Sequence, residues 1–350
     1  MIPGPHPSEV ASYGAFVTVN RGRDVLSTGT DVVEGALEIN GSDTVPEALS
    51  FTVPKSELPT HPRGTFAPYG QTVTPSWRAV THDGVETVIR RAPMLLTGWD
   101  ASGRIRATGL LARVDEAPWA LPSSPRPGAT LREEAQRLVG NELPVVVEGA
   151  NPVLPSTLAW GGDRMKALLD LCAAYGLRPL VKADGQLHLV DAEQSGRDMV
   201  ARYSTDRDVI EVSGGEQRER HNIFKVFAKP KDARSDVPEG RPVPGTVIAT
   251  ERITTGPLAV STYGERSIIR ELEAGTSYYQ CQREAVRMMR EEMAALGTVQ
   301  ASIVADPRLE VGDIISVTTP SRIVVGRVIK LSIPMRHSDS MRVDLQEVAY

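Results

Sequence analysis

The spacing of apolar residues changes near the C-terminal end of the chain from a helical to a strand period. Between Tyr278 and Leu296, where there is no proline or glycine, apolar residues recur at helical spacing. This pattern predicts one amphipathic helix over 278–296, ended by Gly297. The residues that follow alternate between apolar and polar, as strands do. Short strands are therefore expected at 301–305, 314–317, 323–329 and 341–348, with a turn at 309–313.

The first third of the chain has the alternation that is typical of antiparallel strands. The dipeptide Asp83-Gly84 between two such runs is a hairpin signal. A polar, proline-rich stretch from Lys55 to Pro75, with His61 near its middle, predicts an exposed loop, and the proline-rich residues 1–12 predict a loose arm. Strands are expected at 16–19, 36–39, 48–53, 77–81, 85–90, 94–101 and 105–114.

A small module with both helices and strands is expected in the middle of the chain. It follows a proline-rich linker at 118–127. Thr130 and Glu133 form a capping-box pattern that predicts a helix ending at Val139. A second helix is predicted over 163–175, a short strand over 144–148, and a hairpin with a type I′ turn at Asp184-Gly185.

Strand patterns return after residue 195, at 209–212, 222–228 and 247–250. The stretch from Lys229 to Pro244 is charged and rich in proline and has no periodicity, so a mobile excursion between two strands is expected there. These patterns divide the chain into an arm (1–12), a β domain (13–117), an α+β module (118–195) and a second β domain (196–348). The second β domain contains the loop 229–244 and the helix 278–296.

Composition supports a folded protein with many short strands. Of the 350 residues, 41% are hydrophobic and only 5% aromatic, and 30 glycines and 26 prolines suit strands joined by turns. The formal charge of −5 argues against a general nucleic-acid binder. Cys172 and Cys281 lack metal-like spacing, so two buried reduced thiols are favoured over a disulfide. Neither a signal peptide nor an apolar run long enough to cross a membrane is present, so synthesis in a cytoplasm and no stable membrane insertion are expected.

The search for chemistry yields no catalytic, cofactor or metal site. The six histidines have no ligand spacing, and neither a nucleophile elbow nor a phosphate-binding loop occurs. His188 alternates with leucines on the predicted hairpin, which favours a strand residue facing solvent or an interface over a functional residue. The acidic pairs at 133–134 and 291–292 lie among arginines, as solvated ion pairs do. The chain is therefore not expected to be an enzyme.

Three segments, taken in order, resemble the tail hub (baseplate hub) proteins of tailed bacteriophages, a trimeric family shared with contractile injection systems. The first runs from Asn151 through the predicted helix to Leu187, and the second is His221-Asn222-Ile223-Phe224-Lys225-Val226. The third begins with Asp306-Pro307-Arg308 and Gly312-Asp313, and it continues through 326–328 and 341–345. The resemblance is to a siphophage-type minor tail protein, without the C-terminal fibre or lysin extension that many such proteins carry.

The resemblance implies a mainly β fold with α+β insertions. Two tube-like antiparallel β-barrel domains (13–117 and 196–348), with smaller peripheral domains, would give a homotrimer the form of a pseudo-sixfold ring. Such a ring would join the sixfold tail tube and the distal tail protein to tail fibre, spike or other tip proteins. It would lie at the tail tip of the virion, near the tape measure protein.

The ring would also form part of the channel for DNA ejection, through which viral DNA passes without sequence-specific binding. Glu38, Asp43 and Glu47 are the candidates for an acidic channel wall. Two other functions stay open at this point: a tail-associated cell-wall hydrolase, and a carbohydrate-binding adhesin module.

Overall fold

The computed structural model describes residues 1–155, 157–191, 199–213, 220–231, 244–254, 258–294, 298–320, 322–336 and 338–347. The predicted excursion at 229–244 therefore lies largely outside the described residues, as do Gly297 and Val348. The described residues are mainly strand, with a smaller share of helix. It forms two compact units: a larger one, Met1–Val212 with Gln300–Tyr350, and a smaller one, Ser213–Val299.

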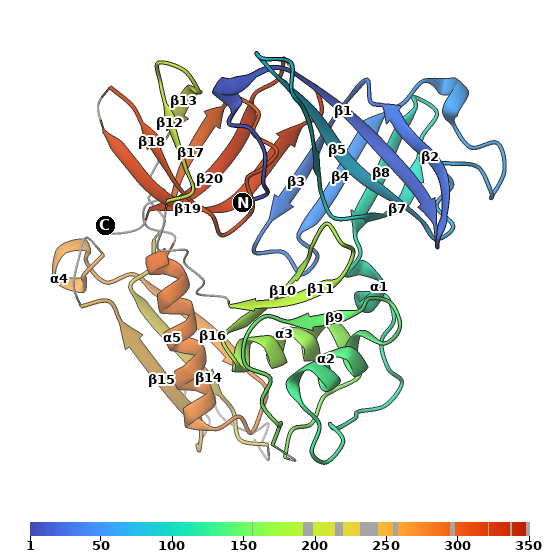
Figure 1. Cartoon of the computed structure of the whole chain (residues 1–350). Coiled ribbons are helices and arrows are strands. Elements are labelled where there is room, and N and C mark those ends of the chain that lie inside the picture. The colour runs from blue at the N-terminus through green and yellow to red at the C-terminus, as the bar shows by residue number, and fades with distance from the viewer. Residues whose placement is uncertain are drawn as a thin grey trace. The chain divides into compact units, whose positions relative to one another are not determined.

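One curled, half-barrel sheet dominates the larger unit (Figure 1). Its main path runs β13-β17-β20-β19-β3-β4-β8-β7-β5-β1-β2, while β18 pairs with β19 and β12, and β6 pairs with β5. The strands are β1 (Val10–Arg21), β2 (Asp24–Asp31), β3 (Glu34–Asn40), β4 (Glu47–Thr52), β5 (Gln71–Thr81), β6 (Glu86–Arg90), β7 (Met94–Trp99), β8 (Arg104–Gly109), β12 (Ala201–Ser204), β13 (Val209–Ser213), β17 (Thr298–Ile303), β18 (Ile314–Thr318), β19 (Ile323–Pro334) and β20 (Met341–Glu347).

The two predicted β regions share this sheet. The antiparallel ladder between β19 and β3, from Lys330 opposite Asn40 to Pro334 opposite Ala36, joins the C-terminal strands to the N-terminal ones. Alternation decides which side chains enter the core: on β1, Val17 and Val19 are fully buried. The sheet is continuous across both regions, and their closure into two barrels stays a prediction.

Three local predictions in the N-terminal region were wrong. The predicted loop does not extend to Pro75, because Pro75 lies inside β5. On one side of β5 the neighbouring strand changes at this point from β7 to β6, so the missing N–H of Pro75 interrupts no ladder there. The end of the strand predicted at 105–114 is a short helix, α1 (Ala112–Asp115). The arm is not loose, because the N–H of Ile2 donates to the carbonyl of Arg308 at 2.8 Å and Pro7 is buried in the 3-10 helix Pro7–Glu9.

The α+β module of the larger unit matches its prediction closely. Helix α2 (Leu131–Val139) begins with the expected capping box between Thr130 and Glu133, and α3 (Arg164–Ala174) is capped by Asp163, whose side chain accepts from the N–H of Lys166. Both helices pack on a sheet of order β10-β11-β9 and share one apolar core with it. The strands are β9 (Val145–Val147), β10 (Leu177–Val181) and β11 (Leu187–Asp191). The hairpin turn is not type I′, which needs two positive φ angles, because only Gly185 has one, of 75°.

The smaller unit has its own sheet and helix. Its strands, in the order β15-β14-β16, are β14 (Ile223–Ala228), β15 (Val247–Arg252) and β16 (Ser267–Leu272). The predicted helix is α5 (Tyr278–Ala294), which packs on one face of this sheet, and a short α4 (Val260–Tyr263) lies between β15 and β16. The resemblance placed the 222–228 strand in a barrel-like region, and this was wrong, because β14 pairs with β15 and β16. Both cysteines are free and buried, as predicted.

Candidate functional site: a buried junction in the larger unit

A buried ionic cluster lies where the chain leaves β17. Asp306 is fully buried and accepts hydrogen bonds from Arg308, at 2.9 Å from Nε and 2.7 Å from a terminal nitrogen. The hydroxyl of Tyr203 donates to the same carboxylate at 2.6 Å. Burial, followed by the charge of Asp306, raises the pKa of Tyr203, which therefore stays a neutral donor. The cluster satisfies each buried charge with an oriented partner.

Residues 305–313, here called the junction segment, connect this cluster to three other parts of the larger unit. A terminal nitrogen of Arg308 donates to the carbonyl of Gly4 at 2.9 Å, which holds the N-terminal segment. Arg91, between β6 and β7, donates to the carbonyl of Leu309. Arg178, on β10 of the α+β module, donates to the carbonyl of Val311 at 2.9 Å. The arginines thus tie both β regions and the module to one irregular segment of backbone.

Gly312 is required where Arg178 crosses the junction segment. Its backbone φ angle is +100°, a conformation that residues other than glycine rarely adopt. A Cβ atom there would lie 2.6 Å from a guanidinium nitrogen of Arg178. The Gly-Asp turn that the sequence singled out is therefore a close approach between the junction segment and the module.

A second buried pair of charges lies next to the junction segment. Glu47 and Arg91 are each 6% exposed and line the same pocket of about 290 Å³, together with apolar residues of β3 and the β10–β11 hairpin. Burial raises the pKa of Glu47 to about 7, although the charge of Arg91 acts in the opposite direction. Among the described residues, Oε2 of Glu47 and Nε of Arg91 have no hydrogen-bond partner. This pair is therefore less well satisfied than the Asp306 cluster.

The three candidates for a channel wall do not lie in equivalent places. Glu38 is exposed on β3, and Asp43 is exposed in the turn between β3 and β4, where Asn40 donates to its carboxylate at 2.9 Å. Glu47 begins β4 and is buried. Alternation along β4 turns the side chain of Glu47 into the core, where it is not available to line a channel. Glu38 and Asp43 therefore stay as the candidates for a channel wall.

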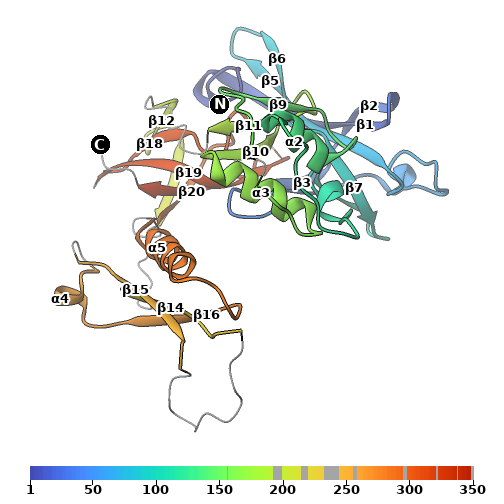
Figure 2. The same ribbon diagram turned by 90° about the horizontal axis from the view of Figure 1, so that it is seen from below.

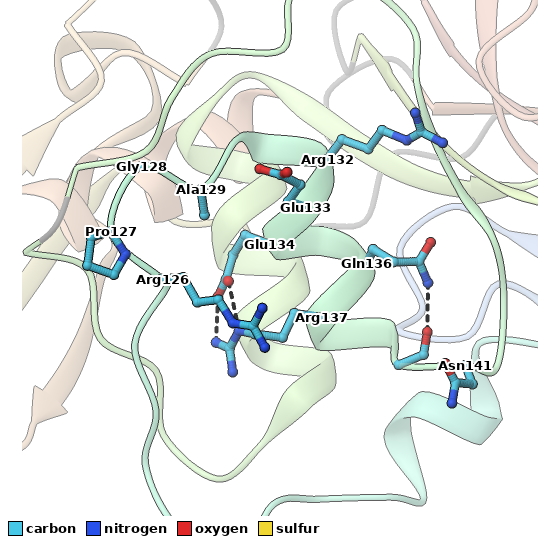
Figure 3. Close-up of a pocket in the computed structure, with 11 residues that line it drawn as sticks. Arg126, Pro127, Gly128, Ala129, Arg132, Glu133, Glu134, Gln136, Arg137 and Asn141 are labelled. Atoms are coloured by element: carbon cyan, nitrogen blue, oxygen red, sulfur yellow. Dashed lines mark hydrogen bonds and ion pairs between the residues drawn. The ribbon is translucent and has the colours of Figure 1, made fainter.

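Charged residues line a pocket beside α2, and their contacts stabilise the module (Figure 3). It encloses about 830 Å³, and Arg126, Arg132 and Arg137 contribute to its walls. Arg137 donates to both carboxylate oxygens of Glu134, at 2.8 and 2.6 Å, and Trp160 donates to the same carboxylate at 2.6 Å. The guanidinium carbon of Arg137 also lies 4.5 Å from the centroid of the Trp119 ring. These contacts hold the 118–127 linker to α2.

His188 is a structural residue of the β10–β11 hairpin. Its two ring nitrogens lie 2.7 Å from an oxygen of Glu148 and 3.0 Å from an oxygen of Asp184. These contacts tie the hairpin turn to the end of β9. Within the described ranges, no group of histidine, cysteine and acidic side chains is arranged to hold a metal ion. The sequence placed His188 on this hairpin, facing solvent or an interface, but did not predict its two carboxylate partners.

Among the described residues of the smaller unit, Asn222 is fully buried and carries a side-chain amide. The side chain of Asn222 donates to the carbonyls of Leu258 and Gly264, at 3.0 and 2.7 Å. Its side-chain oxygen accepts from the N–H of Arg266 at 2.8 Å. Asn222 thus holds Leu258, Gly264 and Arg266, which lie on either side of α4, next to the start of β14. The sequence placed Asn222 at the start of the predicted strand 222–228 and within the second segment of the resemblance, but it did not predict the hydrogen bonds of its side chain.

Most of the junction could not be predicted from the sequence. Asp306 and Arg308 belong to a turn motif that the sequence shows, whereas no local pattern distinguishes Tyr203 or Arg91. One signal was available: an acidic and a basic residue two positions apart, flanking a proline, at the end of an apolar strand. It indicates a buried ion pair only when partners distant in the sequence are known.

Comparison with known proteins places the fold. No protein-family model and no curated protein sequence matches the chain significantly. The tail protein from Neisseria meningitidis MC58 has a similar structure, with 13% sequence identity, a TM-score of 0.59, and coverage of 95% of each chain. The 43 kDa tail protein of prophage MuSo2 from Shewanella oneidensis gives 11% identity, the same TM-score, and coverage of 94% of this chain and 98% of that one. The chain therefore shares the fold of these two tail proteins.

The described part of the chain contains no helix long and apolar enough to cross a bilayer.

Proposed function

We propose that this chain is a structural component of a phage tail tip: a homotrimeric hub that joins the sixfold tail tube to threefold tip components. The observation that carries the proposal is the fold, which matches two tail proteins over nearly the whole chain. In the larger unit, the buried carboxylates of Asp306 and Glu134 are bound by arginine and aromatic side chains of the same chain, as expected of a scaffold. The distal tail protein, the tape measure protein and a fibre or spike are the proposed neighbours.

The oligomeric state tests this proposal most simply. The chain has a mass of 37.9 kDa, so native mass spectrometry distinguishes a monomer from an assembly of three chains. A trimer at micromolar concentration is the expected result. A protein that stays monomeric over the whole concentration range, alone and with its tail partners, would rule out the hub.

A hub in this position would form part of the DNA ejection channel. Glu38 and Asp43 are the remaining candidates for its wall, because both are exposed on the β3–β4 hairpin. An acidic wall repels the phosphate backbone and lets DNA slide past. Changing both residues to lysine should slow DNA ejection from assembled particles. Ejection at the wild-type rate would show that these residues do not line the channel.

We also propose that the chain has no catalytic activity of its own. Two carboxylates line the pocket beside α2, and both have structural partners: Glu134 binds Arg137 and Trp160, and Glu133 caps α2 by accepting from Thr130. Neither carboxylate faces the other across an open cleft, as a glycosidase pair would. A zymogram on host peptidoglycan should show no cleared band. A cleared band at the mass of this chain would contradict this proposal and support the cell-wall hydrolase instead.

A further inference from the structure

The β10–β11 hairpin brings the α+β module into contact with the large sheet. Helices α2 and α3 cover one face of the sheet β10-β11-β9 (Figure 2), and Leu187 and Leu189 enter the core on that face. Residues 180–183 of the hairpin line the pocket of about 290 Å³, together with residues of β3, β7 and the junction segment. The turn continues this contact, because a Cβ atom at Gly185 would lie 3.3 Å from Cγ of Pro93. The conformation of the hairpin therefore decides how the module meets the sheet.

One imidazole fixes this hairpin at two points. His188 alternates with two buried leucines on β11, so its side chain points away from the helices, and it is only 12% exposed. Its Nδ1 lies 2.7 Å from a carboxylate oxygen of Glu148, which follows β9. Its Nε2 lies 3.0 Å from a carboxylate oxygen of Asp184, in the turn. These three residues, here called the His188 clamp, join the turn to the neighbouring strand.

Both carboxylates of the His188 clamp are ionised acceptors. A hydrogen bond from Lys182, followed by one from His188, lowers the pKa of Glu148, although burial acts in the opposite direction. Burial alone would raise the pKa of Asp184, but hydrogen bonds from the N–H of Gln186 and from His188 lower it. An ionised carboxylate can only accept, so both ring nitrogens of His188 must donate. Only the cationic imidazolium has two N–H groups.

The other charged groups on this side of the hairpin have separate places. Arg178 binds the carbonyl of Val311, and Lys182 binds a carboxylate of the clamp. Three more charged residues line the pocket: Glu47, Arg91 and Glu310. Among the described residues, only the two carboxylates of the clamp lie within ion-pair distance of His188. The clamp therefore responds first to the proton on the imidazole.

We propose that the His188 clamp is a pH-sensitive device, which couples the proton on His188 to the conformation of the β10–β11 turn and so to the docking of the module on the large sheet. A neutral imidazole has one N–H and one lone pair, so one carboxylate would face a lone pair and move away from the ring. The clamp is complete below the pH at which histidine releases its proton and opens as the pH rises through that range. All residues of the clamp belong to one module, so the device operates whether or not the chain forms a trimer.

Hydrogen exchange of the full-length chain at pH 6 and pH 8, corrected for the intrinsic exchange rate at each pH, tests the device. The reporters are two N–H groups of the turn, followed in peptides that contain it. The N–H of Gln186 donates to the carboxylate of Asp184 at 2.9 Å, and the N–H of Gly185 donates to the carbonyl of Lys182 at 2.9 Å. Circular dichroism verifies that each variant is folded.

Two variants separate the device from a passive contact. Asp184→Asn keeps the oxygen that accepts from Gln186 and supplies an N–H group in place of the second oxygen, so it can donate to the lone pair of a neutral imidazole. Its intact mass is checked, because an Asn-Gly pair deamidates. His188→Gln has both of its N–H groups on one nitrogen, so it cannot bind carboxylates on opposite sides of the ring.

We expect the turn of the wild type to exchange about fivefold faster at pH 8 than at pH 6, the ratio that corresponds to about one hydrogen bond. Asp184→Asn should bring this ratio close to one, and His188→Gln should exchange fast at both pH values. The comparison with Asp184→Asn cancels the effect of Glu47, which both proteins contain. Equal corrected rates of the wild type at the two pH values, or the wild-type ratio in Asp184→Asn, would overturn the device.

Discussion

The junction of the larger unit and the Asn222 site of the smaller unit both fix an irregular segment of chain, but with different chemistry. The junction uses ionised groups: Asp306 with Arg308 is buried, and Glu47 and Arg91 lie nearby. The smaller unit uses one neutral amide, Asn222, with three hydrogen bonds to backbone atoms. A buried charge can bind several distant segments at once, but it makes stability depend on pH, whereas a neutral amide does not titrate.

Loss of Asp306 should have the largest effect. Asp306→Ala leaves the guanidinium of Arg308 buried without its carboxylate and removes the acceptor of Tyr203, so the larger unit should lose about 3–5 kcal/mol of stability. All four tryptophans, at positions 77, 99, 119 and 160, lie in the larger unit. Urea unfolding followed by tryptophan fluorescence therefore reports this unit. Asp206→Ala, at an exposed aspartate near β12, is the control and should change little.

Loss of Asn222 should have a smaller effect, confined to the other unit. Asn222→Ala leaves two buried carbonyl groups and one N–H without partners, which should cost about 2–3 kcal/mol. Hydrogen exchange should quicken in β14, β15, β16 and α5, while the tryptophan-detected transition of the larger unit stays in place. Equal destabilisation of both units would show that they do not unfold independently.

The stability of the larger unit should depend on pH, in good part because of Glu47. Its pKa rises from 4.5 to about 7 on folding. The folded state therefore binds the proton more tightly, and burying the charge destabilises it above pH 7. Most of this destabilisation is lost as the pH falls from 7 to about 5, because Glu47 becomes protonated. The free energy of unfolding should therefore rise by about 2–3 kcal/mol over this range.

Urea unfolding at pH 8, 7, 6 and 5 measures this gain, with Glu47→Gln as the comparison. The variant has no titrating group at position 47, so it should be more stable than the wild type at pH 8, and the difference should vanish near pH 5. Parallel pH profiles of the two proteins would show that Glu47 is already ionised without cost in the folded state.

The cap of α2 should have the smallest effect. Thr130→Ala removes the side-chain oxygen that accepts from the N–H of Glu133, and should cost about 1 kcal/mol. Thr130→Ser keeps the capping oxygen and serves as the control. Both are read in the tryptophan-detected transition, because Trp160 donates to Glu134 in the first turn of this helix.

The sequence predicted those features that nearby residues decide. Both helices of the module begin at the residues that their caps indicate, and α5 begins at Tyr278 as its apolar spacing predicted. Strand partners were harder to predict, because the same alternation fits any sheet. This is why the 222–228 strand was placed in the wrong sheet, and why β2, whose exposed residues do not alternate clearly, was missed.

The candidate site was predicted less well than the fold. Glu38, Asp43 and Glu47 looked alike in sequence, and only the strand register showed that Glu47 is buried. The junction depends on contacts between residues as far apart as Gly4 and Arg308, and Arg91 and Leu309. Such pairs leave no periodic pattern in a single sequence, so burial and partners had to come from the structure.

The most direct test of the central claim is negative-stain electron microscopy of the purified chain, with the particles classified by symmetry. The hub predicts rings with threefold symmetry and a central hole. Particles that classify only as featureless monomers, with and without the tail partners, would contradict the account.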